Sequence, residues 1–406
     1  MSRLTDCSSP YDRIVNTNMA GRRIEINDMT LEGDCEEMAG IHLTRDDKIR
    51  IAEALAEAGV HRISVLGNSP TPTPEEIDDV REIARRNFMP PLCAFVKSPF
   101  EIDVAADLGL WGVVILISVN ERFFGDGQSG DTVIETARSL AGQARSKGLH
   151  VALMAMDSTR ARPDYLRRFV AETEADWDEL VVCDSIGVVS PWGFEHLVAT
   201  VRSWTDKPLQ VHCHNNTSMA VANAMAAVRG GATVIHATVN GLGEFAGQVP
   251  LEELAVSLGI HFGIDCGLDL ERLTGLSQLV AEAADVPLPV NKPVTGPAAF
   301  AVPETEEIQE AFFGPAREGR LDEVLTFPPG LVGNAAQMSI GRKCSTWTVA
   351  YGLLCMDLEA DQSTLETIAS HVRTHAMEQS GYYLMTQDEF AELVRRGGFP
   401  VMPTSV

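Results

Sequence analysis

The stretch from residue 112 to residue 156 indicates the fold class of this chain. It begins with the apolar run G-V-V-I-L-I-S at 112–118, continues with D-T-V-I-E-T-A-R-S-L-A-G-Q-A-R at 131–145, and ends with the apolar run H-V-A-L-M-A-M at 150–156. The two short runs have the length and composition of buried strands, whereas the apolar residues of the middle segment recur at helical spacing. A strand, a helix and a second strand in this order form the repeating unit of a parallel sheet.

The same alternation runs from about residue 24 to residue 260. Eight short apolar runs are separated by amphipathic segments such as R-D-D-K-I-R-I-A-E-A-L-A-E-A, and these runs begin at residues 24, 62, 92, 112, 150, 179, 209 and 233. The eight units predict an α/β protein with a closed (β/α)8 TIM barrel, whose chemistry lies at the carboxyl ends of the strands. A doubly wound sheet is the alternative, but no G-x-G-x-x-G motif follows the first run.

The alternation stops after about residue 290. The segment V-N-K-P-V-T-G-P-A-A-F-A-V-P-E-T-E-E is rich in proline, and helical patterns follow it. We therefore expect an N-terminal arm over residues 1–23, a catalytic barrel over 24–290, and a linker arm with a mainly helical C-terminal subdomain over 291–406.

The composition restricts the partners of the chain. With 406 residues, 45% of them hydrophobic, the chain can bury a large core. The formal net charge of −25 argues against nucleic acid or an anionic membrane as the main partner, because both would repel the protein. There is neither a long apolar run nor a signal-peptide pattern, and the eight cysteines include no C-x-x-C pair. We expect a cytoplasmic protein with reduced thiols.

Two histidines lie one residue apart in L-Q-V-H-C-H-N-N at 209–216. Residues two apart in a strand point to the same face, so His212 and His214 would project together at the carboxyl end of the seventh strand. This pair could bind one cation or be a structural pair without a metal. Polar residues also close or follow other strands, namely Asp28, Asp34, Lys97, Asp157 and Asp184. Their joint position at one barrel mouth favours a metal site.

Four segments resemble motifs of a known family. V-H-C-H-N-N-T-S-M-A-V-A-N is similar to H-x-H-[ND]-D-x-G-x-A-x-A-N, and T-V-N-G-L-G-E-F-A-G-Q-V-P-L-E-E is similar to T-V-N-G-I-G-E-R-A-G-N-A-x-L-E-E. C-D-S-I-G-V-V-S-P resembles D-T-x-G-x-x-x-P, and L-V-G-N-A-A-Q-M-S-I-G-R-K-C-S looks like a synthase subdomain after the barrel. The family is the metal-dependent DRE-TIM metallolyase superfamily, which includes isopropylmalate synthase, homocitrate synthase and 3-hydroxy-3-methylglutaryl-CoA lyase. The resemblance extends over roughly residues 24–385.

The resemblance implies a divalent metal ion held by His212, His214 and Asp34. Asp34 takes the ligand position when the motifs are aligned on Gly40 with one inserted residue. Such a mixed nitrogen and oxygen set is compatible with Zn, Mn, Fe or Co, and less well with Mg. The resemblance also implies that the carboxylate and the neighbouring oxygen of a 2-oxo acid or 2-hydroxy acid chelate the ion, which polarises the carbonyl group.

The chain departs from the family after the first strand. Where the family has D-T-T-L-R-D-G-E-Q-S-x-G, this chain has D-M-T-L-E-G-D-C-E-E-M-A-G, so Glu32 and Gly33 replace the arginine that stabilises an enolate. Two family glutamates are replaced by Ser64 and Met156, and a family asparagine is replaced by Gln248. The resemblance therefore implies a retained metal site with altered acid–base residues.

Other residues could take over the replaced functions. Lys97 or Arg160 could supply the missing positive charge, because both follow barrel strands. The candidates for a new general base, each equally plausible as a loop residue, are Glu32, Asp157 and Glu244. The residues of the matching motifs that we expect to bind substrate are Ser185, Asn240 and Gln248.

Three functions remain open at this point. The first is a synthase that condenses an acyl thioester, possibly an acyl-CoA, with a small-molecule 2-oxo acid. The second is a metal-dependent aldolase or lyase that uses no thioester, and the third is a catalytically inactive barrel. The region after residue 290 is expected to cross to a partner subunit in a homodimer, as it does in the synthases that the chain resembles.

Overall fold

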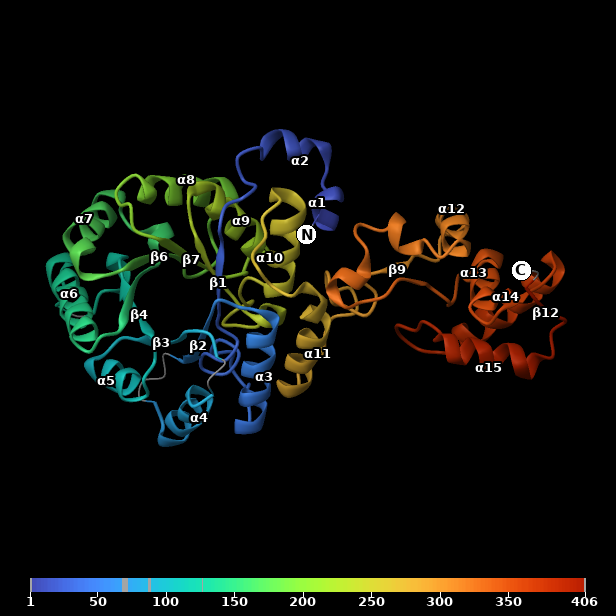
Figure 1. Cartoon of the computed structure of the whole chain (residues 1–406), viewed down its shortest axis with the longest axis horizontal. Helices are drawn as coiled ribbons and strands as arrows, with labels where there is room; N and C mark the ends of the chain where they lie inside the picture. Colours follow the sequence, from blue (N-terminus) through green and yellow to red (C-terminus); the bar gives the residue numbers. More distant parts are fainter. Residues whose placement is uncertain (1, 68–71, 87–88, 126, 405–406) are drawn as a thin grey trace. The chain divides into compact units, whose positions relative to one another are not determined.

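The computed structural model describes residues 2–67, 72–86, 89–125 and 127–404. Contacts divide the chain into two units, Met1–Leu288 and Pro289–Val406. Each unit has its own buried core. Figure 1 shows the helices and strands of each unit.

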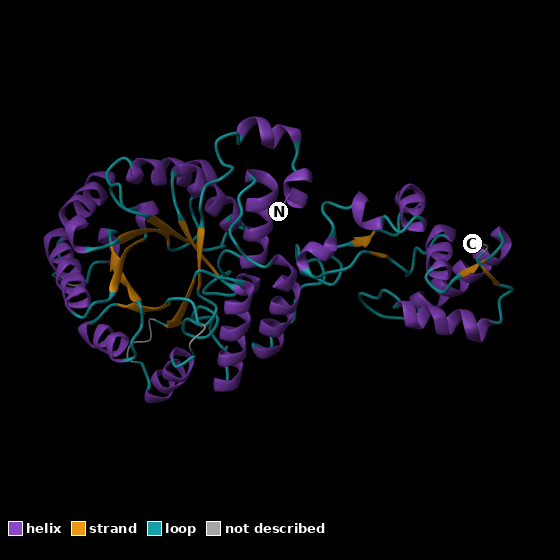
Figure 2. Ribbon diagram, in the orientation of Figure 1, coloured by secondary structure: helices purple, strands orange, loops and turns teal. Residues whose placement is uncertain are grey.

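The first unit is a closed barrel of eight parallel strands that pair in the order of the chain, with β8 next to β1 (Figure 2). The strands are β1 (Glu25–Asp28), β2 (Arg62–Leu66), β3 (Leu92–Val96), β4 (Gly112–Ser118), β5 (His150–Met156), β6 (Glu179–Asp184), β7 (Leu209–Cys213) and β8 (Val234–Ala237). The predicted TIM barrel is confirmed. Periodicity alone located the strands because each is almost completely buried on both faces.

The helices that surround the barrel follow the strands in the chain. They are α3 (Arg45–Ala58), α4 (Pro74–Ala84), α5 (Pro99–Asp107), α6 (Gly130–Ser146), α7 (Pro163–Thr173), α8 (Pro191–Arg202), α9 (Ala220–Gly230), α10 (Leu251–Ser257) and α11 (Leu273–Ala283). Several begin at a Ser or Thr whose hydroxyl accepts a backbone N–H of the first turn, as Thr44 does for α3 and Ser98 for α5. These N-caps begin the helices close to the strand ends.

The first residues of the chain belong to the barrel unit. Helices α1 (Ser2–Asp6) and α2 (Pro10–Val15) pack against the turn of helix at Leu258–Phe262 that follows α10. The Nδ1 atom of His261 lies 2.8 Å from a carboxylate oxygen of Asp12. The segment that we predicted as an N-terminal arm therefore covers one side of the barrel.

The interior of the barrel is apolar near the mouth and polar below it. A cluster of inward-facing residues fills the upper part, and its members are Met29, Phe95, Val114, Ala152, Met154, Val181 and Cys183. Near the amino ends of the strands, Arg62 forms two hydrogen bonds of 2.6 and 2.9 Å with the Glu179 carboxylate. Both side chains are buried.

The second unit is mainly helical, as predicted. Its helices are α12 (Glu306–Arg317), α13 (Thr346–Leu354), α14 (Gln362–Met377) and α15 (Gln387–Gly397). Two short strand pairs join β9 (Ala301–Val302) to β10 (Gln337–Met338) and β11 (Leu358–Glu359) to β12 (Met402–Pro403). No helix among the described residues has the length and apolar character needed to cross a membrane. Dimerisation through this unit stays a prediction.

Candidate active site

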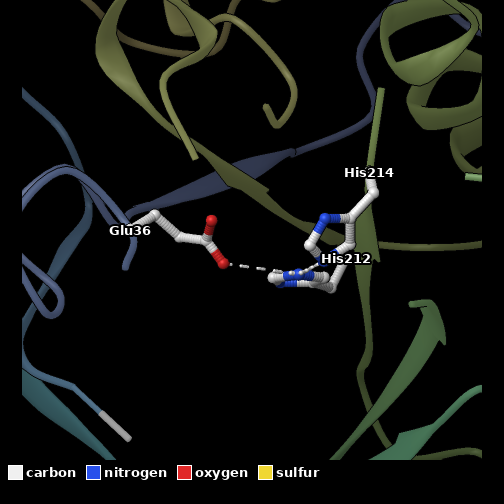
Figure 3. A group of neighbouring side chains, drawn as sticks. All are labelled: Glu36, His212 and His214. Carbon is white, nitrogen blue, oxygen red and sulfur yellow. Dashed lines mark hydrogen bonds and ion pairs between the residues drawn. The ribbon is translucent and has the colours of Figure 1, made fainter. Parts of the chain in front are cut away.

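Three ligand-type side chains meet at the mouth of the barrel (Figure 3). The Nε2 atoms of His212 and His214 lie 3.1 Å apart, and Oε1 of Glu36 lies 3.9 Å from Nε2 of His212. All three residues are buried, and one ligand atom from each lies within 4.8 Å of the other two. Atoms at such separations can all lie about 2 Å from a single ion. This group of three side chains could hold one metal ion.

The pleat of β7 explains why the two histidines point in the same direction. The strand continues to Cys213, and the alternation of its side chains places His212 and His214 on the inner face, with Cys213 on the outer face. Burial holds the pKa of His212 well below its usual range and lowers the pKa of His214 to about 4. Both imidazoles are therefore neutral near pH 7, which is the form that binds a metal ion.

Gln248 completes this cluster from the loop after β8. Its side-chain nitrogen Nε2 lies 3.1 Å from Nε2 of both His212 and His214. Its oxygen Oε1 is buried without a hydrogen-bond partner among the described residues. Rotating the amide by 180°, which leaves its shape unchanged, would turn this oxygen toward the imidazole nitrogens. An orphaned oxygen beside two bare nitrogens fits a fourth ligand to a cation.

Glu36 carries the negative charge of the cluster. Burial raises the pKa of this carboxyl to about 8, although the backbone N–H of Glu244 donates to Oε2 at 2.9 Å. A divalent cation would reverse this effect, because a nearby positive charge favours the ionised carboxylate. The donor set of two neutral imidazoles, one carboxylate and one amide therefore fits a divalent ion.

Asp34, which we predicted as the third ligand, lies elsewhere, and this prediction is corrected. One carboxylate oxygen accepts the backbone N–H of Leu43 at 3.0 Å, and the other lies 3.3 Å from Nζ of Lys48. The reason is the backbone of residues 33–37, which all have positive φ values between 48° and 62°. This left-handed turn directs Asp34 toward α3 and places Glu36 beside the histidines.

A cavity of about 430 Å³ opens above the cluster. Its floor is apolar and consists of Phe95, Leu116, Met154, Met156 and Cys183. Of the predicted catalytic and substrate-binding residues, those that line it are Glu32, Asp157, Arg160, Ser185 and Glu244. Among its described lining residues, carboxylates outnumber cationic side chains, since Glu37 also contributes and Arg160 is the single arginine or lysine.

Arg160 is held in a fixed orientation at the cavity wall. Its Nε and Nη2 donate to the Asp157 carboxylate at 2.8 and 2.7 Å, and its guanidinium lies 5.4 Å from the ring centre of Phe123. Asp157 also accepts a 2.6 Å hydrogen bond from Nδ2 of Asn120, and the Asp157 backbone N–H donates to Oγ of Ser185 at 2.8 Å. None of these bonds uses Nη1 of Arg160.

Besides Asp34 and Gln248, two further predicted site residues do not line the cavity. Lys97 is exposed and does not line the cavity, because its backbone already enters α5 and its N–H donates to Oε2 of Glu101 at 2.6 Å. Asn240 has a φ of 63° and holds the loop after β8, where Nδ2 donates to the carbonyl oxygen of Ser277 at 2.9 Å. Neither residue lines the described cavity, and the roles that we predicted for Lys97 and Asn240 stay predictions.

Sequence reasoning missed two residues near the metal cluster. Glu36 was overlooked because the alignment placed Asp34 in its position. His236 was overlooked although it is a polar residue within the apolar run V-I-H-A of β8. A polar residue inside a buried strand is unusual and can indicate a functional position. In the structure, Nδ1 of His236 lies 3.3 Å from Nδ1 of His212.

Comparisons with known proteins agree with the fold. The family model described as HMGL-like matches residues 23–280. The (R)-citramalate synthase CimA of Methanocaldococcus jannaschii is 32% identical over 86% of this chain and 70% of its own length. The homocitrate synthase AksA of Methanopyrus kandleri is 30% identical over 90% of this chain and 91% of its own length.

A solved structure shows the same architecture. The HMG-CoA lyase of Bacillus subtilis aligns with a TM-score of 0.60 and 19% identity, over 66% of this chain and 96% of the lyase. At this identity the likeness concerns the fold alone. The family match covers most of the barrel and is supported by relatives at 30% identity or more over most of the chain. The chain therefore belongs to the HMGL-like family of TIM-barrel enzymes.

Proposed function

We propose that this protein is a metal-dependent enzyme that condenses an acyl thioester with a monocarboxylic 2-oxo acid. The observation that carries the proposal is the convergence of Glu36, His212 and His214 at the base of the cavity. Relatives named as citramalate and homocitrate synthases over most of the chain support a synthase rather than a lyase. A bound divalent ion would act as a Lewis acid toward the carbonyl group of the 2-oxo acid.

Arg160 is our candidate for the residue that stabilises the enolate oxygen of the thioester. The arginine of the family motif is absent, and Arg160 is the single arginine or lysine among the described cavity residues. Asp157 and Phe123 fix its orientation, so a developing negative charge would meet a donor that needs no rearrangement. The Nη1 group is the one available for this role.

Glu244 is our candidate for the base that removes a proton from the thioester. It lines the cavity, and burial raises the pKa of its carboxyl, which brings a base closer to its working range at neutral pH. Asp157 is less suitable, because Arg160 and Asn120 already donate to its carboxylate oxygens. We assign Asp157 the role of holding Arg160.

The lining of the cavity favours a 2-oxo acid with a small apolar side chain. The floor of Phe95, Leu116 and Met154 offers no hydrogen-bonding side chain, and Glu32 and Glu37 would repel a second substrate carboxylate. Desolvating that carboxylate without a cationic partner would be costly. Pyruvate or 2-oxobutyrate therefore fits the cavity better than 2-oxoglutarate.

A metal-dependent aldolase that uses no thioester is the second candidate. Glu32, which is buried at the cavity wall where the family has arginine, favours it, because a carboxylate does not stabilise an enolate. Product analysis separates the two functions. The zinc- or manganese-loaded protein is incubated with each 2-oxo acid, with and without acetyl-CoA, and thiol release and new acids are measured.

The proposal expects free CoA and a 2-hydroxy dicarboxylic acid with pyruvate, and a kcat/KM at least about 100-fold lower with 2-oxoglutarate. Carbon–carbon cleavage or aldol products that form equally well without acetyl-CoA would instead establish the second candidate. A chain that binds the metal and turns over no 2-oxo acid would contradict both.

A further inference from the structure

A chain of polar side chains connects the candidate metal cluster to the lower part of the barrel. Nδ1 of His212 lies 3.3 Å from Nδ1 of His236, and Nε2 of His236 lies 2.6 Å from Oε1 of Gln210. Nε2 of Gln210 donates to the Glu179 carboxylate, which Arg62 holds with two further hydrogen bonds. All five side chains are buried. None of the lower four lines the cavity.

The two ends of this chain determine where its hydrogens lie. At the lower end, burial alone would raise the pKa of Glu179, but the nearby His150 ring and the hydrogen bonds from Arg62 lower it to about 2, so this carboxylate only accepts. Gln210 must then donate its amide hydrogen to Glu179 and accept with its oxygen. The contact of 2.6 Å with that oxygen requires a hydrogen on Nε2 of His236, and neutral His236 then has a bare Nδ1.

At the upper end, Nε2 of His212 faces His214 and Glu36 (Figure 3). It also lies 3.1 Å from Nε2 of Gln248. A metal ligand needs a bare nitrogen there, so the hydrogen of neutral His212 must be on Nδ1. This Nδ1–H points to the bare Nδ1 of His236 at 3.3 Å. The two requirements, deduced from opposite ends of the chain, meet at this contact without conflict.

We infer that His236 and Gln210 are positioning residues that fix the tautomer and orientation of His212 for metal binding. The inference rests on the metal site of the proposed function. Every donor in the chain points toward Glu179, so the hydrogen bonds polarise in one direction and increase electron density on Nε2 of His212. Metal-bound histidines commonly donate their second N–H directly to a carboxylate, which makes the ligand nitrogen more basic. Here His236 and Gln210 stand between His212 and the Glu179 carboxylate and connect them by hydrogen bonds.

His214 provides a contrast within the same site. Its ring contacts Phe245 at the cavity mouth, with centres 5.5 Å apart, and its support is a backbone hydrogen bond with Glu244 in the loop after β8 instead of a side chain of the barrel interior. The two histidines are thus neighbours on one strand with different supports. The inference predicts that His212 depends on β8 for its ligand geometry.

The test compares two substitutions of His236. In His236→Gln the new amide can accept from Nδ1 of His212 and donate to Gln210, whereas His236→Leu can do neither. We expect His236→Leu to bind Zn²⁺ about 10- to 100-fold more weakly than the wild type, and His236→Gln to stay within about threefold. The dissociation constants are measured by competition with a fluorescent chelator. Ile235→Val, which alters the adjacent buried residue of β8, is the matched control and should bind normally.

A second measurement does not require a variant that folds. Nitrogen NMR of the ¹⁵N-histidine-labelled, zinc-loaded wild type should show His236 with hydrogen on Nε2 and a bare Nδ1. Equal Zn²⁺ affinity of folded His236→Leu and the wild type, or a hydrogen on Nδ1 of His236, would overturn the inference while leaving the metal site intact. A wild type that binds no Zn²⁺ would instead remove the metal site itself, and with it this inference.

Discussion

The candidate metal site joins two regions of the barrel mouth that are built differently. On the β7 side, His212 and His214 leave a regular strand, and the pleat alone makes them neighbours. On the β1 side, Glu36 belongs to a loop in which five consecutive residues have positive φ. Such conformations are costly for residues other than glycine and persist only where surrounding contacts impose them. The two histidines are therefore positioned by the local repeat of a strand, whereas Glu36 is positioned by tertiary contacts.

The largest effect should come from the β7 side. We expect the purified protein to hold about one equivalent of divalent metal, and His212→Ala or His214→Ala to lose it, with affinity reduced at least about 100-fold, because each removes a direct ligand. Metal content after dialysis measures this, and the melting temperature of the metal-free variants shows whether the barrel persists. Full retention of metal in both variants would show that the histidines are a structural pair.

The second prediction compares the two carboxylates of the β1 loop. Glu36→Gln should weaken metal binding about 10- to 100-fold, since it removes the charged ligand, and Asp34→Asn should leave the affinity unchanged. Asp34→Asn should instead lower the free energy of unfolding by about 1–2 kcal/mol, because it weakens a nearly buried ion pair with Lys48. Chelator competition and urea unfolding measure the two quantities. The opposite result would restore Asp34 as the ligand.

These two carboxylates also show how far the sequence could predict the site. The eight strands and the histidine pair follow from apolar periodicity and from the two-residue repeat of a strand, which are local properties. Arg160 and Ser185 could be placed at the mouth because they follow strand ends. Which of Asp34 and Glu36 lies beside the histidines depends on a left-handed turn of the backbone. In this turn Asp34 contacts Lys48 and Glu36 contacts Glu244, and no local sequence pattern predicts such a turn. The position of Lys97 outside the cavity has a similar cause, because the chain passes from the end of β3 directly to the N-cap of α5 at Ser98.

A third effect concerns the charge that replaces the family arginine. Arg160→Lys should lower kcat by about 100-fold, because a lysine cannot keep both the Asp157 contact and the free donor. Lys97→Ala, at the end of β3, should leave kcat and KM within about twofold. Steady-state assays with acetyl-CoA and pyruvate measure both. If Lys97→Ala is the variant that loses activity, the positive charge comes from outside the cavity that we describe.

The smallest effect that we predict is a difference in pH dependence between the two sides of the site in the metal-free protein. On the histidine side, burial lowers the pKa of His214, which follows β7, to about 4 and that of His236 in β8 to about 3. The unfolded chain therefore binds these protons more strongly below pH 6.5. Their contribution to stability is therefore lost as the pH falls below this value. On the β1 side, burial raises the pKa of Asp28, the last residue of the strand, from 3.8 to about 7.

Asp28 has the opposite sign, because the folded protein binds its proton more strongly than the unfolded chain between about pH 4 and 7. Its contribution is present at low pH and lost as the pH rises through about 7, with a slope of at most about 1.4 kcal/mol per pH unit. Asp28→Asn keeps an uncharged side chain that can still accept from the N–H of Thr30, as Oδ1 does at 2.9 Å. The substitution removes the loss of stability that Asp28 causes as the pH rises. The free energy of unfolding should therefore increase more steeply from pH 4 to 7 than in the wild type. Urea unfolding of the two metal-free proteins at several pH values measures this slope, and identical slopes would mean that Asp28 is ionised in the folded barrel.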